Sequence, residues 1–185
     1  MVNVNDLKNG MTIKLDGNIY LVLEFLHVKP GKGPAFVRSK LKNLRTGAII
    51  EHTFNAGIKI ERASIDRVTM QFLYASGDSY NFMNMETYEQ IEINKQQIEE
   101  EVPYLKEGLN VELTFYESEL LGINLPDKIE YKVTSTEPAV RGNTVTNATK
   151  EAVLETGLVI KVPLFIEADE VIIVSTKDGK YDSRA

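Results

Sequence analysis

The residues best suited to chemistry lie between His27 and Arg38, in the stretch H-V-K-P-G-K-G-P-A-F-V-R. Pro30 and Pro34 bracket Gly31-Lys32-Gly33. Each proline fixes its own φ angle and biases the preceding residue toward an extended conformation, whereas glycine can adopt the positive φ values that a chain reversal needs. Lys32 is therefore the one long side chain at the tip of a stiff loop, where its ammonium group can donate three hydrogen bonds. A surface hairpin with an incidental lysine explains these residues equally well.

Apolar runs on both sides of this stretch predict the strands that position it. Ile19–Val28 and Phe36–Leu44 should pair through the loop, and Asp16-Gly17-Asn18 is a hairpin signal that joins Met11–Leu15 to the first of them. With Ala48–Phe54, this makes four or five short strands in about 60 residues, which favours a small barrel over an open sheet. We expect this unit to end near residues 59–62, with a linker at 62–66.

The charge of the chain is distributed unevenly. The net charge is −6, yet residues 1–63 contain ten Lys and Arg against five Asp and Glu. No acidic residue occurs between Glu24 and Glu51, a segment that contains six basic ones. A one-sided positive charge of this kind is typical of a surface that binds a polyanion. The alternative is a solvated basic surface without a partner.

The remaining residues predict two further β units. Strands are expected at Thr69–Tyr74, Tyr80–Met85, Glu89–Ile93, Leu109–Tyr116, Leu120–Leu125, Ile129–Thr134, Gly157–Val162 and Val171–Ser175. Asn94 and Gln97 have the spacing of a capping box, which predicts a short helix that ends near Val102, before Pro103. A polar loop is expected at Val140–Val153. The chain is thus predicted to be all-β, with three consecutive small barrels at 1–63, 64–127 and 128–185.

Several classes of protein are excluded by what the sequence lacks. There is no cysteine, only His27 and His52 could supply imidazole, and no phosphate-binding loop or hydrolase motif is present. We therefore expect neither an enzyme nor a metal or cofactor site. An enzyme that uses Lys32 to form a Schiff base would need a desolvated lysine, which a tip between two glycines does not provide. No apolar run reaches the roughly 20 residues of a membrane span, and Met1–Asp6 does not resemble a signal peptide, so a cytoplasmic protein is expected.

Three segments closely resemble the bacterial translation elongation factor P family. They are K-P-G-K-G-P-A-F-V-R-S-K-L-K-N-L-R-T-G at Lys29–Gly47, T-G-L-V-I-K-V-P-L-F at Thr156–Phe165, and D-G-K-Y-D-S-R at Asp178–Arg184. The resemblance implies an L-shaped molecule with an N-terminal SH3-like (KOW-type) barrel followed by two OB-folds. It also implies a monomer that binds the ribosome beside the P-site peptidyl-tRNA and relieves stalling at consecutive prolines.

The same resemblance assigns roles to individual residues. Lys32 aligns with the tip that reaches the CCA end of the tRNA at the peptidyl-transferase centre, and a modifying enzyme extends that residue in many members. The loop is formed by Pro30, Gly31, Gly33 and Pro34. Contacts with tRNA or ribosomal RNA are expected from Lys29, Arg38, Lys40, Lys42, Arg45, Tyr181, Ser183 and Arg184.

Two positions depart from the family pattern. Gly142, Asn143 and Thr144 occupy the place of a Gly-Asp-Thr motif that reaches the E-site codon of the mRNA, and Asn143 keeps an acceptor oxygen but loses the charge. Asp169 replaces an expected glycine, although Asp tolerates left-handed φ values better than most residues.

A stand-alone RNA-binding OB-fold protein without a ribosomal role is the competing interpretation. Such proteins expose stacking aromatic residues on a basic face. Residues 64–185 contain 22 acidic against 11 basic residues, which argues against it.

Overall fold

The computed structural model describes residues 1–138 and 148–185, and three barrel-like antiparallel sheets contain most of them. The first sheet has the order β1-β6-β2-β3-β4-β5, the second β11-β10-β7-β8-β9 and the third β14-β13-β12-β15-β16. Contacts divide the chain into two compact units, residues 1–68 with 113–122, and residues 69–112 with 123–185. The predicted all-β class and barrel-like sheets are therefore confirmed.

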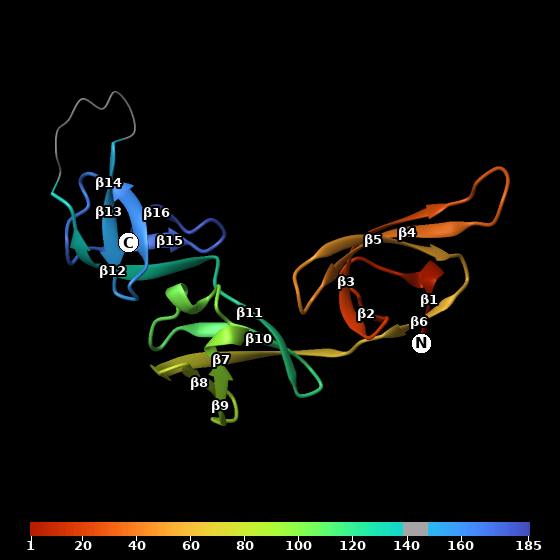
Figure 1. Ribbon diagram of the computed structural model, residues 1–185, viewed down its shortest axis with the longest axis horizontal. Coiled ribbons are helices and arrows are strands. Elements are labelled where there is room, and N and C mark those ends of the chain that lie inside the picture. The colour runs from red at the N-terminus through yellow and green to blue at the C-terminus, as the bar shows by residue number, and fades with distance from the viewer. Residues whose placement is uncertain (139–147) are drawn as a thin grey trace. The chain divides into compact units, whose positions relative to one another are not determined.

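The first sheet is built from short strands around a long hairpin. Its strands are β1 (Val2–Asn3), β2 (Thr12–Leu15), β3 (Asn18–Val28), β4 (Phe36–Asn43), β5 (Ile49–Asn55) and β6 (Lys59–Arg62), with a 3-10 turn, η1, at Val4–Asp6. Asp16 and Gly17, with φ values of +50° and +78°, form the predicted turn between β2 and β3. The β3–β4 hairpin projects from the rest of this sheet and ends in the loop of residues 29–35, hereafter the tip loop (Figure 1).

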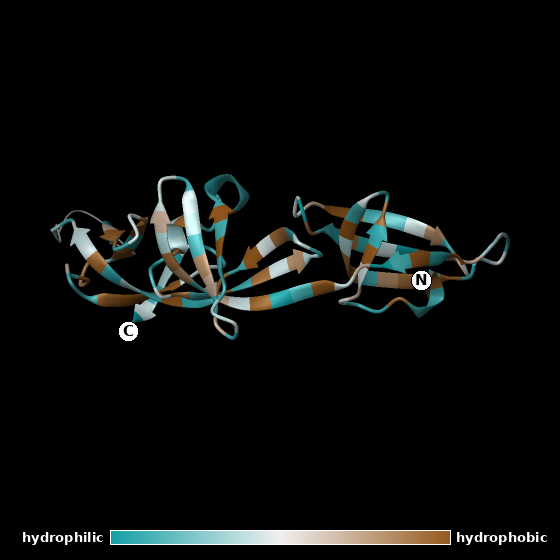
Figure 2. Ribbon diagram, turned by 90° about the horizontal axis from the view of Figure 1, so that it is seen from below, coloured by the Kyte–Doolittle hydropathy of each residue, from teal (hydrophilic) through white to brown (hydrophobic). Residues whose placement is uncertain are grey.

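The second sheet follows the predicted strands closely, whereas only three of the five strands of the third sheet were predicted. The second contains β7 (Ile65–Ser76), β8 (Ser79–Asn84), β9 (Gln90–Asn94), β10 (Asn110–Tyr116) and β11 (Glu119–Asn124). The third contains β12 (Lys128–Thr136), β13 (Thr149–Leu154), β14 (Val159–Pro163), β15 (Val171–Ser175) and β16 (Lys180–Arg184). Polar and apolar residues alternate along many strands (Figure 2), which is the pattern of a sheet with one buried face.

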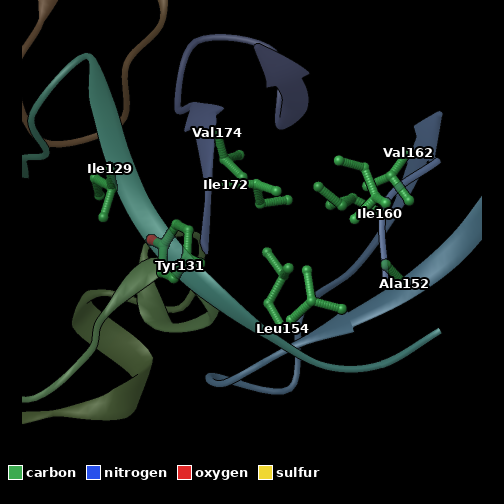
Figure 3. Packing of buried hydrophobic residues seen from close by; sticks show 10 residues of the cluster. Ile129, Tyr131, Ala152, Leu154, Ile160, Val162, Ile172 and Val174 are labelled. Atoms are coloured by element: carbon green, nitrogen blue, oxygen red, sulfur yellow. The ribbon is translucent and has the colours of Figure 1, made fainter. Parts of the chain in front are cut away.

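The core of the third sheet illustrates how this alternation works. In β12, Ile129, Tyr131 and Val133 are buried, whereas the residues between them are exposed. These side chains meet others from β13, β14 and β15 in one cluster (Figure 3). The Tyr131 hydroxyl donates a hydrogen bond of 2.5 Å to the carbonyl oxygen of Tyr104. Burial raises the pKa of Tyr131, so the phenol remains a neutral donor.

Three local expectations were wrong. The capping box at Asn94 and Gln97 forms, but it starts only a 3-10 turn, η2 (Lys95–Gln97), because Ile98 leaves helical geometry at φ −132°. A second turn, η3 (Val102–Tyr104), includes Pro103 near its start, where the missing N–H is not needed. No continuous helix therefore occupies this segment.

The other two errors concern strands with polar sequences. Lys59–Arg62 was expected only to end the first unit before the linker, but it forms strand β6, which pairs with both β1 and β2. The segment Val140–Val153 was expected to be a loop, and its described part includes β13. The sequence of β13 does not show the expected alternation of polar and apolar residues, because Lys150 occupies one of the buried positions of the strand. No helix in the described parts of the chain is long and apolar enough to cross a membrane.

Candidate nucleic-acid interface

The tip loop presents Lys32 at the far end of the β3–β4 hairpin. The two strands pair up to Val28 and Phe36, and a hydrogen bond of 3.0 Å from the Ala56 N–H to the Ala35 carbonyl ties the loop end to the chain after β5. Gly31, Lys32, Gly33 and Pro34 are all exposed. No ion pair found within residues 1–138 and 148–185 includes Lys32. Its ammonium group is therefore free to meet a partner.

The two loop glycines differ in their backbone geometry. Gly33 has a φ of +99°, which L side chains rarely adopt, whereas Gly31 is not in the positive-φ region. A Cβ atom at either position would meet nothing within 4 Å. The loop therefore requires glycine at position 33 for conformational reasons, and the same requirement does not hold at position 31.

Three basic side chains form a row on the outer face of β4. Arg38, Lys40 and Lys42 alternate with the buried side chains of Val37, Ser39, Leu41 and Asn43. The alternation of a strand therefore puts all three cations on one face of the hairpin. We call Arg38, Lys40 and Lys42 the basic row.

The neighbouring strands give the three cations different electrostatic surroundings. Lys40 lies opposite Glu24 of β3 and Glu51 of β5, whereas Arg38 and Lys42 lie opposite uncharged residues on both sides. Cross-strand partners have Cβ atoms about 5 Å apart, so the two carboxylates offset the charge of Lys40. Arg38 and Lys42 thus have no carboxylate directly opposite them on either neighbouring strand. Lys29 is also exposed at the start of the tip loop.

Arg45 lies beyond the end of β4 and already has hydrogen-bond partners within the protein. Its Nε and Nη2 donate to the two carboxylate oxygens of Glu119 at 3.1 and 2.8 Å, and its Nη1 donates to the Gly17 carbonyl at 2.7 Å. Hydrogen bonding to Glu119 raises the pKa of Arg45. The guanidinium group of Arg45 is therefore already engaged by oxygens of the protein itself.

Tyr181, Ser183 and Arg184, the residues predicted to contact RNA near the C-terminus, all lie on β16. Their side chains differ in the contacts that they make within the protein. Tyr181 is half-buried and packs against the core of the third sheet, and the Ser183 hydroxyl donates to Asp182 at 3.1 Å. Arg184 donates to Glu170 at 2.8 Å and lies over the ring of Phe165, with its guanidinium carbon 4.6 Å from the ring centroid. Sequence reasoning missed both partners of Arg184.

The two departures from the family pattern can be placed only in part. Asp169 adopts a φ of +70°, the left-handed conformation for which a glycine was expected. Its carboxylate lies 3.7 Å from the Lys132 ammonium group. Gly142, Asn143 and Thr144 lie outside the described residues.

The two histidines contact aromatic rings of the first sheet. His27 and His52 make edge-on contacts with Phe25 and Phe54, at centroid distances of 5.6 and 4.5 Å. In the parts of the chain that the structure describes, no group of three His, Asp or Glu residues could hold a metal ion.

Models of one protein family match successive parts of this chain. The elongation factor P (EF-P) KOW-like domain matches residues 3–60, the EF-P OB domain matches residues 65–123, and the elongation factor P C-terminal domain matches residues 129–184. Each match covers most of one of the three sheets.

Two proteins named elongation factor P are similar to this chain over its full length. The protein named elongation factor P of Phytoplasma australiense is 63% identical, and the alignment covers 100% of this chain and 98% of the relative. That of Moorella thermoacetica is 53% identical, with 100% of both chains covered.

Solved structures agree over part of the chain. Eukaryotic translation initiation factor 5A from Methanococcus jannaschii is 30% identical, with a TM-score of 0.54 over 67% of this chain and 93% of its own. An initiation factor 5A family protein from Naegleria fowleri shares the fold at 16% identity, with a TM-score of 0.55 over 67% of this chain and 96% of its own.

Proposed function

Because this chain belongs to the elongation factor P family, whose members are translation factors and not enzymes, we propose that it binds the ribosome beside the P-site peptidyl-tRNA. There it stimulates peptide-bond formation and relieves stalling at consecutive prolines. The observation that carries this proposal is the exposed Lys32 at the end of the β3–β4 hairpin. The competing interpretation, a stand-alone RNA-binding OB-fold protein, is not favoured, because full-length relatives bear the name of an elongation factor.

The proposed mechanism is positioning. Proline is a constrained nucleophile, and peptide-bond formation depends on holding the reacting groups close to attack geometry. The Lys32 ammonium group donates hydrogen bonds to the CCA end of the tRNA and restricts its motion. A slim ammonium group on a flexible stem fits a narrow approach better than a planar guanidinium group does. The factor needs no acid or base of its own.

The basic row and its surroundings supply the binding contacts in this proposal. Lys29, Arg38 and Lys42 bind phosphates of tRNA or ribosomal RNA, with a smaller contribution from Lys40 because of its two acidic neighbours. Tyr181, Ser183 and Arg184 add RNA contacts at β16, and Gly142, Asn143 and Thr144 contact the E-site codon.

The proposal also includes the organisation and location of the factor. We place the domain limits at residues 1–63, 64–127 and 128–185, with the first domain responsible for the tip. The factor acts as a monomer in the cytoplasm. A modifying enzyme extends Lys32, whose exposure supports access to its amine.

Replacing Lys32 by alanine tests the function directly. Because a solvated loop side chain contributes little to stability, the free energy of unfolding should change by less than about 0.5 kcal/mol. Peptide-bond formation on a template with three consecutive proline codons should fall to near the rate without factor in a reconstituted translation assay. Lys8→Ala, which removes another exposed lysine of the same compact unit, is the matched control. Full rescue by Lys32→Ala would refute the proposed role of the tip.

A modification of Lys32 is tested by mass. Intact-mass measurement of the protein from its native cells, followed by peptide mapping across Lys29–Arg38, should reveal an added group on Lys32. An unmodified peptide would refute the modification and leave the positioning role to the plain lysine.

A further inference from the structure

Arg45 and Glu119 join parts of the chain that are far apart in sequence. Arg45 follows β4, and Glu119 begins β11, 74 residues later. We propose that this pair, hereafter the clamp, fixes the base of the β3–β4 hairpin and thereby positions Lys32 at its other end. The inference rests on the proposed function of Lys32.

The hydrogen bonds of the Arg45 side chain make the clamp specific. The guanidinium group engages both carboxylate oxygens of Glu119, and its third nitrogen donates to the Gly17 carbonyl in the turn between β2 and β3. A bidentate arginine–carboxylate pair fixes direction as well as distance. Arg45 thus connects the β2–β3 turn, the segment after β4 and the β10–β11 hairpin.

An apolar cluster lies in the same region and supports this attachment. Ile19, Ala63 and Leu121 are buried together, and Leu44, Ile65 and Tyr116 pack against them. The Lys14 ammonium group lies 5.3 Å from the centroid of the Tyr116 ring, and hydrogen bonding with Tyr116 raises the pKa of Lys14. Residues 113–122 accordingly form one compact unit with residues 1–68.

The contacts of Arg45 favour this role over an RNA contact. Each of its three nitrogens already donates to a protein oxygen, and Glu119 offsets its charge. A phosphate group would have to displace that carboxylate or approach beside it. Arg38 and Lys42 offer cations without such a competitor.

The geometry of the hairpin explains how the clamp acts on Lys32. The clamp is at the Asn43 end of β4, and the tip loop begins beyond Phe36 at the other end. The eight residues of β4 span about 26 Å at about 3.3 Å per residue. A tilt of about 5° at the base therefore moves the tip by about 2 Å, and displacements of about 1 Å can reduce a reaction rate by up to about 100-fold.

Charge reversal tests the clamp on the ribosome. Arg45→Glu and Glu119→Arg should each lower the maximal rate of peptide-bond formation at consecutive prolines by at least about fivefold. The concentration of factor at half-maximal rate should stay within about twofold, because the phosphate contacts remain. Combining the two substitutions restores the ion pair in reverse and should recover most of the rate.

Two further variants distinguish the clamp from other roles. Arg45→Lys keeps the charge but loses the bidentate geometry, so the clamp predicts a lowered maximal rate, whereas a phosphate contact predicts a nearly normal one. Arg38→Glu is the control for an RNA contact and should raise the half-saturating concentration. Thermal unfolding of each variant verifies that the fold is intact at the assay temperature.

The outcomes separate this inference from the proposed function. The clamp is refuted if Glu119→Arg is fully active while Arg45→Glu and the double variant are equally impaired, because Arg45 then acts alone. It is also refuted if Lys32→Ala abolishes rescue in the same assay and no clamp variant alters it. If Lys32→Ala retains full rescue, the proposed function fails first, and the clamp loses its basis with it.

Discussion

Exchanging each tip-loop glycine for alanine separates the shape of the loop from its charge. Gly33 has a φ of +99°, and Gly31 is not in the positive-φ region, whereas both have open space around the site of a new methyl group. An L residue held in a left-handed conformation costs about 1–2 kcal/mol. Gly33→Ala should therefore disfavour the present loop shape by that amount, and Gly31→Ala should cost less than about 0.5 kcal/mol.

The strain at position 33 should affect function more than stability. Because nothing packs around Gly33, the loop can relieve the strain by changing shape while the barrel stays intact. A cost of about 1–2 kcal/mol lowers the population of the present shape by about five- to thirtyfold. The rate of peptide-bond formation at consecutive prolines should fall by a similar factor, with ribosome binding nearly unchanged.

Binding and rescue are measured together for the two variants, with Lys32→Ala as the reference for a lost tip. Gly31→Ala should behave as the unsubstituted protein in both assays. Equal rescue by Gly31→Ala and Gly33→Ala would refute the reasoning, because the two positions differ in backbone conformation and not in available space.

Three more predictions follow from particular contacts. Gly179→Ala should destabilise the protein by about 1 kcal/mol more than Gly77→Ala. Both glycines have positive φ, but of the two only Gly179 would bring its new Cβ against a side-chain atom, at 2.7 Å. Equal losses of stability in denaturant unfolding would contradict this. Burial raises the pKa of Glu101, which means that the charged carboxylate destabilises the folded protein and the neutral carboxyl group does not. Glu101→Gln should therefore raise the free energy of unfolding at pH 7 but not near about pH 4. An effect that does not change with pH would contradict this. Lys42→Ala should reduce the slope of log ribosome affinity against log salt by about one unit and Lys40→Ala by less, which titrations at several salt concentrations can check.

Local sequence determined most of the strands, because apolar alternation and turn residues act within a few positions. The turn at Asp16 and Gly17, the left-handed Gly33 and the capping box at Asn94 all depend on neighbours along the chain. The exposure of Lys32 also follows from local sequence, because its neighbours at the tip are two glycines and two prolines and it is the only long side chain among them.

Contacts between distant residues required the tertiary structure, because they depend on strand register and on how sheets close. Lys59–Arg62 has a polar sequence and becomes a strand only through its pairing with β1 and β2. The sequence between Glu24 and Glu51 contains no acid, yet the register of three strands puts both carboxylates beside Lys40. Arg45 is part of the basic segment in the sequence, but in the structure its guanidinium group donates hydrogen bonds to Glu119. Charge composition therefore indicated which end of the chain is basic, and only the fold decided which of those cations remain free to bind.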